Sequence, residues 1–137
     1  MERTLAIIKP DAIAGGHSGE IFKAIDKAGL HIVVAIPAQV VGKEVWETFY
    51  AEHKGKPFYE KLIEFMSSGR SAFLLLEGPN AIQAWRSAMG ATDPKKADPQ
   101  SLRGRFGTGG PANVVHGSDG PESAKREISL FFPDQED

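Results

Sequence analysis

The 137-residue sequence contains no cysteine. This absence excludes disulfide bonds, cysteine-based catalysis and zinc sites built from thiolates. Long hydrophobic runs are also missing, since no segment approaches the roughly 20 apolar residues of a membrane-spanning helix. Residues 1–4 lead directly into a strand-like segment, without the charged start and apolar centre of a signal peptide. We therefore expect a cytoplasmic protein with no membrane partner.

The chain also lacks a strong charge of either sign, because its net charge is −2. This balance argues against general attraction to nucleic acid or anionic membranes, so bound phosphate must be met by local basic residues. The fractions of hydrophobic (41%) and charged (25%) residues are ordinary for globular proteins. The length fits one domain over residues 1–137, with no room for a second core.

Hydrophobic periodicity divides the chain into strands and helices. We expect strands at residues 4–8, 30–41, 71–77 and 113–116. The first should end in a turn at Pro10, and Pro37 predicts that the second lies at an edge or carries a bulge. Helices are expected from a Ser18 cap to Gly29, at 45–53, 58–66 and 81–89, and at 121–128.

The segment 90–110 has no periodicity, and loops of this length in compact domains are usually functional or disordered. We favour a functional loop because it carries Arg103 and Arg105. The order of elements predicts an α+β fold: a ferredoxin-like βαββαβ unit with helices covering one face of a four-stranded, mainly antiparallel sheet. Such a fold is compatible with many unrelated activities.

The most informative segment is residues 113–120, NVVHGSDG. His116 leaves an apolar strand just before a glycine turn, so a rigid element holds it while one side stays open. Neutral imidazole is a competent nucleophile near neutral pH. Considered alone, a structural histidine bonded to the backbone is the more common interpretation. Asp119 is placed to cap the last helix, with Pro121 in the first turn and Glu122 at the capping-box position. That helix would turn Glu127 towards the imidazole.

Two longer segments, residues 4–11 (TLAIIKPD) and 113–119 (NVVHGSD), resemble the signature segments of nucleoside diphosphate kinases. Shorter segments match in order and spacing: residues 49–53, 56–58, 90–92 and 102–104. The resemblance covers nearly the whole chain. It implies that His116 accepts a phosphoryl group on a ring nitrogen and that Glu127 orients the imidazole, with Ser118 supporting either group. Lys9 and Asn113 would hold the ribose hydroxyls, with Lys9 also near the transferring phosphate.

The same resemblance implies that Arg86, Thr92 and Arg103 grip the β- and γ-phosphates, that Tyr50 lines the site and that Phe58 stacks on the base. Mg²⁺ would arrive on the nucleotide phosphates, with no metal site in the protein. Several fixed cations around a nucleophile suit phosphoryl transfer. Taken singly, each side chain also has an ordinary interpretation as surface charge, core aromatic or turn former. Only the joint pattern favours catalysis.

The chain departs from the family pattern at Arg70, Arg105 and Gly120. None of these removes a catalytic group. Nucleoside triphosphates and diphosphates are the implied partners, with broad base and sugar tolerance. A homo-oligomer is also implied, and the short tail at 131–137 favours a tetramer over a hexamer.

Two other functions stay open at this point. One is a phosphohistidine-carrying or nucleotide-sensing module without efficient turnover. The other is a nucleic-acid-binding βαββαβ domain, although the strands lack an aromatic platform for RNA and we expect no dedicated nucleic-acid site.

Overall fold

In the computed structural model, which describes residues 1–135, four strands form one antiparallel sheet with the order β2-β3-β1-β4. The strands are β1 (Glu2–Ile8), β2 (His31–Val40), β3 (Arg70–Gly78) and β4 (Val115–Gly117). The α-helices are α1 (Pro10–Ala14), α2 (Ser18–Lys27), α3 (Lys43–Phe49), α4 (Tyr59–Ser67), α5 (Ala81–Met89), α6 (Leu102–Phe106) and α7 (Pro121–Phe131). Short 3-10 helices are η1 (Ala51–His53), η2 (Pro94–Lys96) and η3 (Pro133–Gln135). The predicted ferredoxin-like α+β fold is confirmed.

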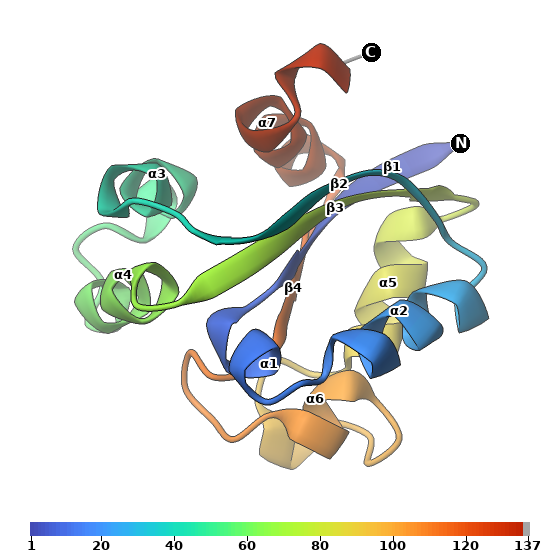
Figure 1. The fold of residues 1–137 in the computed structure, drawn as a ribbon, viewed down its shortest axis with the longest axis horizontal. Coiled ribbons are helices and arrows are strands. Elements are labelled where there is room, and N and C mark those ends of the chain that lie inside the picture. The colour runs from blue at the N-terminus through green and yellow to red at the C-terminus, as the bar shows by residue number, and fades with distance from the viewer. Residues whose placement is uncertain (136–137) are drawn as a thin grey trace.

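Both faces of the sheet are covered, because the side chains of its central strands alternate between two hydrophobic cores. On β1, Ala6 and Ile8 pack with α2 and α5 residues, whereas Leu5 and Ile7 pack with α3, α4 and α7 residues. Figure 1 shows α3, α4 and α7 on one side of the sheet and α2 and α5 on the other. The prediction that helices cover one face was therefore wrong. The continuous apolar runs of β1 and β3 are the reason, since a strand covered on one face alternates with polar residues.

Strand β2 lies at the edge of the sheet, and most of its side chains are exposed. Its pairing with β3 shifts register between Ile36 and Gln39, around Pro37. Proline cannot donate a ladder hydrogen bond, so an edge position with an irregularity fits it. Both features predicted from Pro37 are confirmed.

The ends of several elements differ from their predictions. Ser18 is the first residue of α2, and His17 at the cap position makes no capping bond through its side chain. Phe22 of α2 is 41% exposed. Strand β1 runs into α1 instead of a simple turn, because Pro10 occupies the first helical position, where its missing N–H costs nothing.

The segment 90–110 contains ordered helices and is not an extended loop. The Ser101 hydroxyl caps α6 by accepting a hydrogen bond from the Gly104 backbone N–H at 3.1 Å. At the start of α7, Gly120 is the cap residue and makes no side-chain bond. Asp119 instead accepts a hydrogen bond from the Ser123 hydroxyl, so the predicted capping box with Glu122 does not form.

None of the helices within residues 1–135 combines the length and apolar character needed to cross a bilayer.

Candidate active site

The site forms where β1 and β4 lie antiparallel, with Ile7 opposite His116 and Ile8 opposite Val115. The chain leaves β1 at Lys9 and enters β4 from Asn113, so these polar residues meet at one end of the strand pair. A backbone hydrogen bond from Lys9 N to the Val114 carbonyl, 2.9 Å long, continues the contact beyond the ladder. Strand pairing therefore brings together residues more than 100 positions apart.

His116 is paired with Glu127 of α7. The distance from His116 Nε2 to Glu127 Oε1 is 2.9 Å, and the side chains are 18% and 7% exposed. The same carboxylate oxygen accepts a hydrogen bond from Ser118 Oγ at 2.7 Å. A hydrogen on Nε2 would donate to this carboxylate, which leaves Nδ1 with a lone pair. No partner for Nδ1 occurs in the part of the chain that the structure describes.

Ser118 and Trp85 hold this pair in place. Fully buried Ser118 accepts a hydrogen bond from Leu5 N at 3.2 Å, which connects β1 to the carboxylate of α7. Trp85 Nε1 on α5 donates to the His116 carbonyl at 3.1 Å. Gly117, predicted as a turn residue, lies in β4, and a Cβ there would come within 2.5 Å of the Trp85 ring. Close packing against Trp85 therefore requires glycine at this position.

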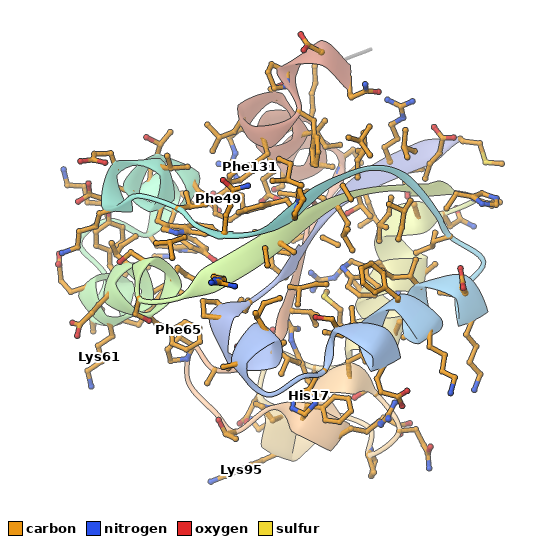
Figure 2. All side chains as sticks on the ribbon, in the orientation of Figure 1. His17, Phe49, Lys61, Phe65, Lys95 and Phe131 are labelled. Carbon is orange, nitrogen blue, oxygen red and sulfur yellow. The ribbon has the colours of Figure 1, made fainter. Side chains whose placement is uncertain are left out.

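Aromatic rings line the other side of the imidazole. Phe49 meets the His116 ring edge to face, with centroids 5.1 Å apart, and Tyr50 packs against Phe49 at 4.8 Å. Figure 2 shows Phe49 beside Phe131 of α7, and their rings lie 5.5 Å apart. Burial, with a smaller effect of the Glu127 charge, raises the pKa of the Tyr50 phenol well above its usual value. Tyr50 therefore lines the site beside Glu127 as a neutral phenol.

Lys9, Asn113 and Arg103 form a second buried group. Lys9 Nζ donates to Asn113 Oδ1 at 2.7 Å, and Asn113 Nδ2 donates to the Thr92 carbonyl at 3.1 Å. Arg103 donates to three backbone carbonyls, those of Gly90, Asn113 and Val115. The amide and the guanidinium together tie the ends of α5 and α6 to the segment that carries the histidine.

Burial destabilises the charged forms of Lys9 and Arg103. Desolvation, assisted by the charge of Arg103, lowers the pKa of Lys9 to about 7, while Asp11 opposes the shift. Desolvation also lowers the pKa of Arg103 to about 10, with a further contribution from Arg86. Excess positive charge held out of water is the environment that an anionic ligand stabilises.

Val114, between Asn113 and the histidine strand, has a backbone φ of +63° and is buried. Left-handed backbone costs an L-residue about 1–2 kcal/mol, and a β-branched side chain rarely adopts it. Strained backbone of this kind clusters at functional sites.

Three predicted site residues are exposed to solvent. Phe58 is 49% exposed and lies at the end of a series of ring contacts that runs from Phe49 through Tyr50 and His53. Arg86 and Thr92 are exposed and line a hollow of about 430 Å³. Thr92 holds Asn113 through its backbone carbonyl, and its hydroxyl makes no hydrogen bond within residues 1–135.

The predicted location of Arg103 needs correction. Arg103 was expected on a loop, but it belongs to α6 and is 7% exposed. Arg105, a departure from the family pattern, forms an ion pair with Glu20 of α2 and lies over the Phe106 ring. Sequence reasoning assigned no role to Trp85, Asp11 or Phe49. The regular spacing of Trp85 and Phe49 indicated burial alone, whereas Asp11 stood in a segment already singled out for its resemblance to the family.

A partly buried imidazole–carboxylate pair beside clustered cationic groups, on a ferredoxin-like sheet, defines a class of protein that handles phosphate groups. The family model described as nucleoside diphosphate kinase matches residues 2–136. The nucleoside diphosphate kinase of Parafrankia sp. (strain EAN1pec) is 51% identical over 132 residues, which cover 96% of each chain. Nucleoside diphosphate kinase 2 of Protochlamydia amoebophila (strain UWE25) is 52% identical, covering 99% of this chain and 94% of that protein.

Solved structures agree. The crystal structure of the Aquifex aeolicus nucleoside diphosphate kinase superposes with a TM-score of 0.91 at 40% identity, covering 96% of this chain and 94% of that one. The chain therefore belongs to the nucleoside diphosphate kinase family and is a phosphotransferase of nucleotide metabolism.

Proposed function

We propose that the enzyme transfers the γ-phosphate of a nucleoside triphosphate to a nucleoside diphosphate by a ping-pong mechanism through a phosphohistidine on His116. The observation that carries this proposal is the hydrogen-bond geometry of the imidazole. Nε2 faces Glu127 at 2.9 Å, which orients the lone pair of Nδ1 away from the carboxylate. The nucleophilic nitrogen is then Nδ1.

In the first half-reaction, the Nδ1 lone pair forms a bond to the γ-phosphorus while the bond to the β-phosphate oxygen breaks. The nucleoside diphosphate leaves with that electron pair. The ring becomes cationic while Nε2 keeps its proton, and Glu127 and Ser118 stabilise it through the contacts described above. In the second half-reaction, a β-phosphate oxygen of another diphosphate attacks phosphorus and the P–N bond breaks.

Lys9, Arg86 and Arg103 are the groups proposed to neutralise phosphate charge. Arginine has five N–H donors, and Arg103 uses three on backbone carbonyls, so donors remain for phosphate oxygens. Lys9 adds a point charge, and a bound phosphate offsets the free-energy cost of burying that charge. Thr92 would add a hydroxyl donor, and Asn113, already bonded to Lys9, would share the ribose hydroxyls with it.

The donors at this site suit phosphate oxygens better than a metal ion. They are ammonium, guanidinium and amide groups, and residues 1–135 contain no cluster of three His, Asp or Glu side chains arranged to bind a metal. We propose that Mg²⁺ is carried by the nucleotide and that Lys9, Arg86 and Arg103 position the phosphates around it. When bound, Mg²⁺ neutralises charge on the β- and γ-phosphate oxygens.

Broad base tolerance is part of the proposal. The half-exposed Phe58 ring offers a face on which any base can stack. Discrimination would need buried groups matched to one base edge. Comparing kcat/KM for adenine, guanine, cytosine and uracil diphosphates with one donor tests this. A preference of about ten-thousand-fold for one base would contradict it.

A homo-oligomer, with a tetramer expected, also stays a proposal. The free edge of β2 exposes Ile32, Val33 and Val40, and α2 exposes Phe22, which together suit a second copy of the chain. Light scattering after size exclusion would contradict the tetramer by giving a monomer or a hexamer. A cytoplasmic location is likewise proposed, from the cysteine-free sequence, and cell fractionation tests it.

The decisive experiment uses His116→Ala, with His31→Ala on the exposed β2 strand as a matched control. After incubation with ATP and Mg²⁺, intact-protein mass spectrometry should find one added phosphate on the wild type and the control, and none on His116→Ala. Phosphorylation of His116→Ala would refute the assignment. A wild type that binds nucleotide without transferring phosphate would indicate a sensing module.

A further inference from the structure

The backbone at Val114 is the most strained point of the site, and Asp11 of α1 contacts it directly. Asp11 Oδ2 accepts a hydrogen bond from Val114 N at 3.1 Å. The Val114 carbonyl accepts from Lys9 N at 2.9 Å. Both backbone polar groups of the left-handed residue are therefore bonded to the segment that follows β1.

The conformation of Val114 decides how two site residues lie relative to one another. Asn113, on one side, binds Lys9 and Arg103, while His116 follows two residues later in β4. If Val114 relaxed to an ordinary extended conformation, the chain direction at Asn113 would change. The Lys9–Asn113 hydrogen bond would then no longer lie in its present position relative to the imidazole.

Asp11 also places negative charge beside the cationic cluster. Its Oδ1 is buried and has no hydrogen-bond partner within the described residues, so this carboxylate keeps a costly position. Two charged groups act on Lys9 from the elements packed around it: Arg103 of α6 opposes the ammonium, and Asp11 of α1 favours it. An acidic residue at the start of a helix can face solvent, so the first turn of α1 does not require a buried carboxylate oxygen without a hydrogen bond. The buried position of Asp11 therefore points to a second role.

We propose that Asp11 is a positioning residue for phosphoryl transfer: one carboxylate oxygen holds Val114 in its left-handed conformation, and the charge of the carboxylate supports the Lys9 ammonium. This inference rests on the proposed function. It differs from a purely structural role, in which Asp11 would stabilise only the first turn of α1. A structural role predicts lost stability with unchanged kinetics in the folded fraction.

Two substitutions separate the proposed effects. Asp11→Asn keeps an oxygen that can accept from Val114 N but removes the charge. Asp11→Ala removes both. Asp26→Asn, the same chemical change on the exposed face of α2, is the control. Kinetics are normalised to the folded fraction, measured by circular dichroism, because both Asp11 variants will lose stability.

In Asp11→Asn, kcat/KM should stay within a few-fold of wild type at acidic pH, and its alkaline limb should move about one pH unit lower, because Lys9 loses its charged neighbour. In Asp11→Ala, kcat/KM should fall at least about tenfold at every pH, since a misplaced reacting group commonly costs that much or more. Adding Val114→Gly to Asp11→Ala should restore part of the loss, because glycine adopts positive φ without strain.

Phosphoenzyme formation by wild type and Asp26→Asn separates this inference from the proposed function. If neither is phosphorylated by ATP, the proposed function fails. If both are phosphorylated but the Asp11 variants keep the wild-type pH limb and kcat/KM per folded molecule, Asp11 is structural and the inference is overturned. Failure of Val114→Gly to improve Asp11→Ala would overturn the backbone part alone.

Discussion

The site divides into an inner group that the fold holds rigidly and an outer group that it leaves exposed. The outer group is Phe58, Arg86 and Thr92, whose side chains are open to solvent. The inner group is buried or nearly so and bonded to several strands and helices. Its members are Lys9, Arg103, Asn113, His116, Ser118 and Glu127.

The two groups differ in how far they are arranged for chemistry before the nucleotide arrives. The inner group carries lowered pKa values at Lys9 and Arg103 and a strained backbone at Val114, all of which lower the stability of the empty fold. In return, the charged groups need no reorganisation when a phosphate binds. The outer group does not lower the stability of the empty fold in this way, so its contribution should appear only in nucleotide binding. Each substitution below tests one side of that division.

Arg103→Ala should have the largest effect because it damages both catalysis and folding. We expect a loss of roughly 2–4 kcal/mol of transition-state stabilisation, typical for one preorganised donor. The Gly90 and Val115 carbonyls would also lose their donor, which costs about 1–3 kcal/mol for each group left buried and unpaired, whereas the Asn113 carbonyl keeps its bond from Val115 N. Activity per folded molecule and urea denaturation measure the two effects. Arg103→Lys, which keeps the charge without the planar fork, is the control.

A stable Arg103→Ala enzyme with normal activity would show that the inner group does not depend on this guanidinium.

Glu127→Gln should come next. The amide oxygen can still accept from His116 Nε2, but the negative charge that stabilises the cationic ring is gone. We expect about a hundredfold slower phosphoenzyme formation, the lower range for a group that assists proton and charge balance. Rapid-quench kinetics with ATP measures the rate. Glu122→Gln, at an exposed position of the same helix, should leave it unchanged.

Much of this architecture could be predicted from the sequence. Apolar, β-branched runs located the strands of the sheet, and the order of elements fixed the fold class. The segment around His116 indicated the proposed nucleophile only together with the other matching segments, since a histidine between a rigid strand and a polar turn is by itself more often structural. These are local signals, which a sequence carries directly.

What the sequence did not reveal depends on tertiary contacts. Arg103 looked like a loop residue because α6 has only five residues and depends on packing instead of propensity. Asp11 was given no role because its partner, Val114 N, lies 103 positions away in the sequence. Coverage of the second sheet face was likewise missed, since an apolar strand indicates burial without saying what lies on each side.

The pH dependence of stability tests the cost of Lys9. Below pH 7 the folded and unfolded states both carry the ammonium, so the full cost of burying it is present. Between pH 7 and the ordinary value of 10.5, the folded state binds fewer protons than the unfolded state, so rising pH relieves the cost. Wild type should therefore gain about 2 kcal/mol of stability relative to Lys9→Met as pH rises two units above 7. Urea unfolding of both proteins at the two pH values measures this, with Lys27→Met as the exposed control. A constant difference between the two proteins would show that Lys9 does not titrate in this range.

Phe58→Ala tests the outer group and should have the smallest effect. The side chain is 49% exposed and contributes little to the core, so the thermal midpoint should barely move. Loss of stacking should weaken nucleotide binding by about 1 kcal/mol, at the low end for a base on an aromatic ring, because solvent reaches Phe58. This loss should raise KM for every base to a similar extent and leave kcat nearly unchanged, because Phe58 does not touch the reacting atoms. Lys61→Ala, at an exposed position of α4, is the control and should alter neither constant. A fall in kcat for Phe58→Ala would show that this ring acts in the transition state. Phe58 would then not belong to an outer group that contributes only to nucleotide binding.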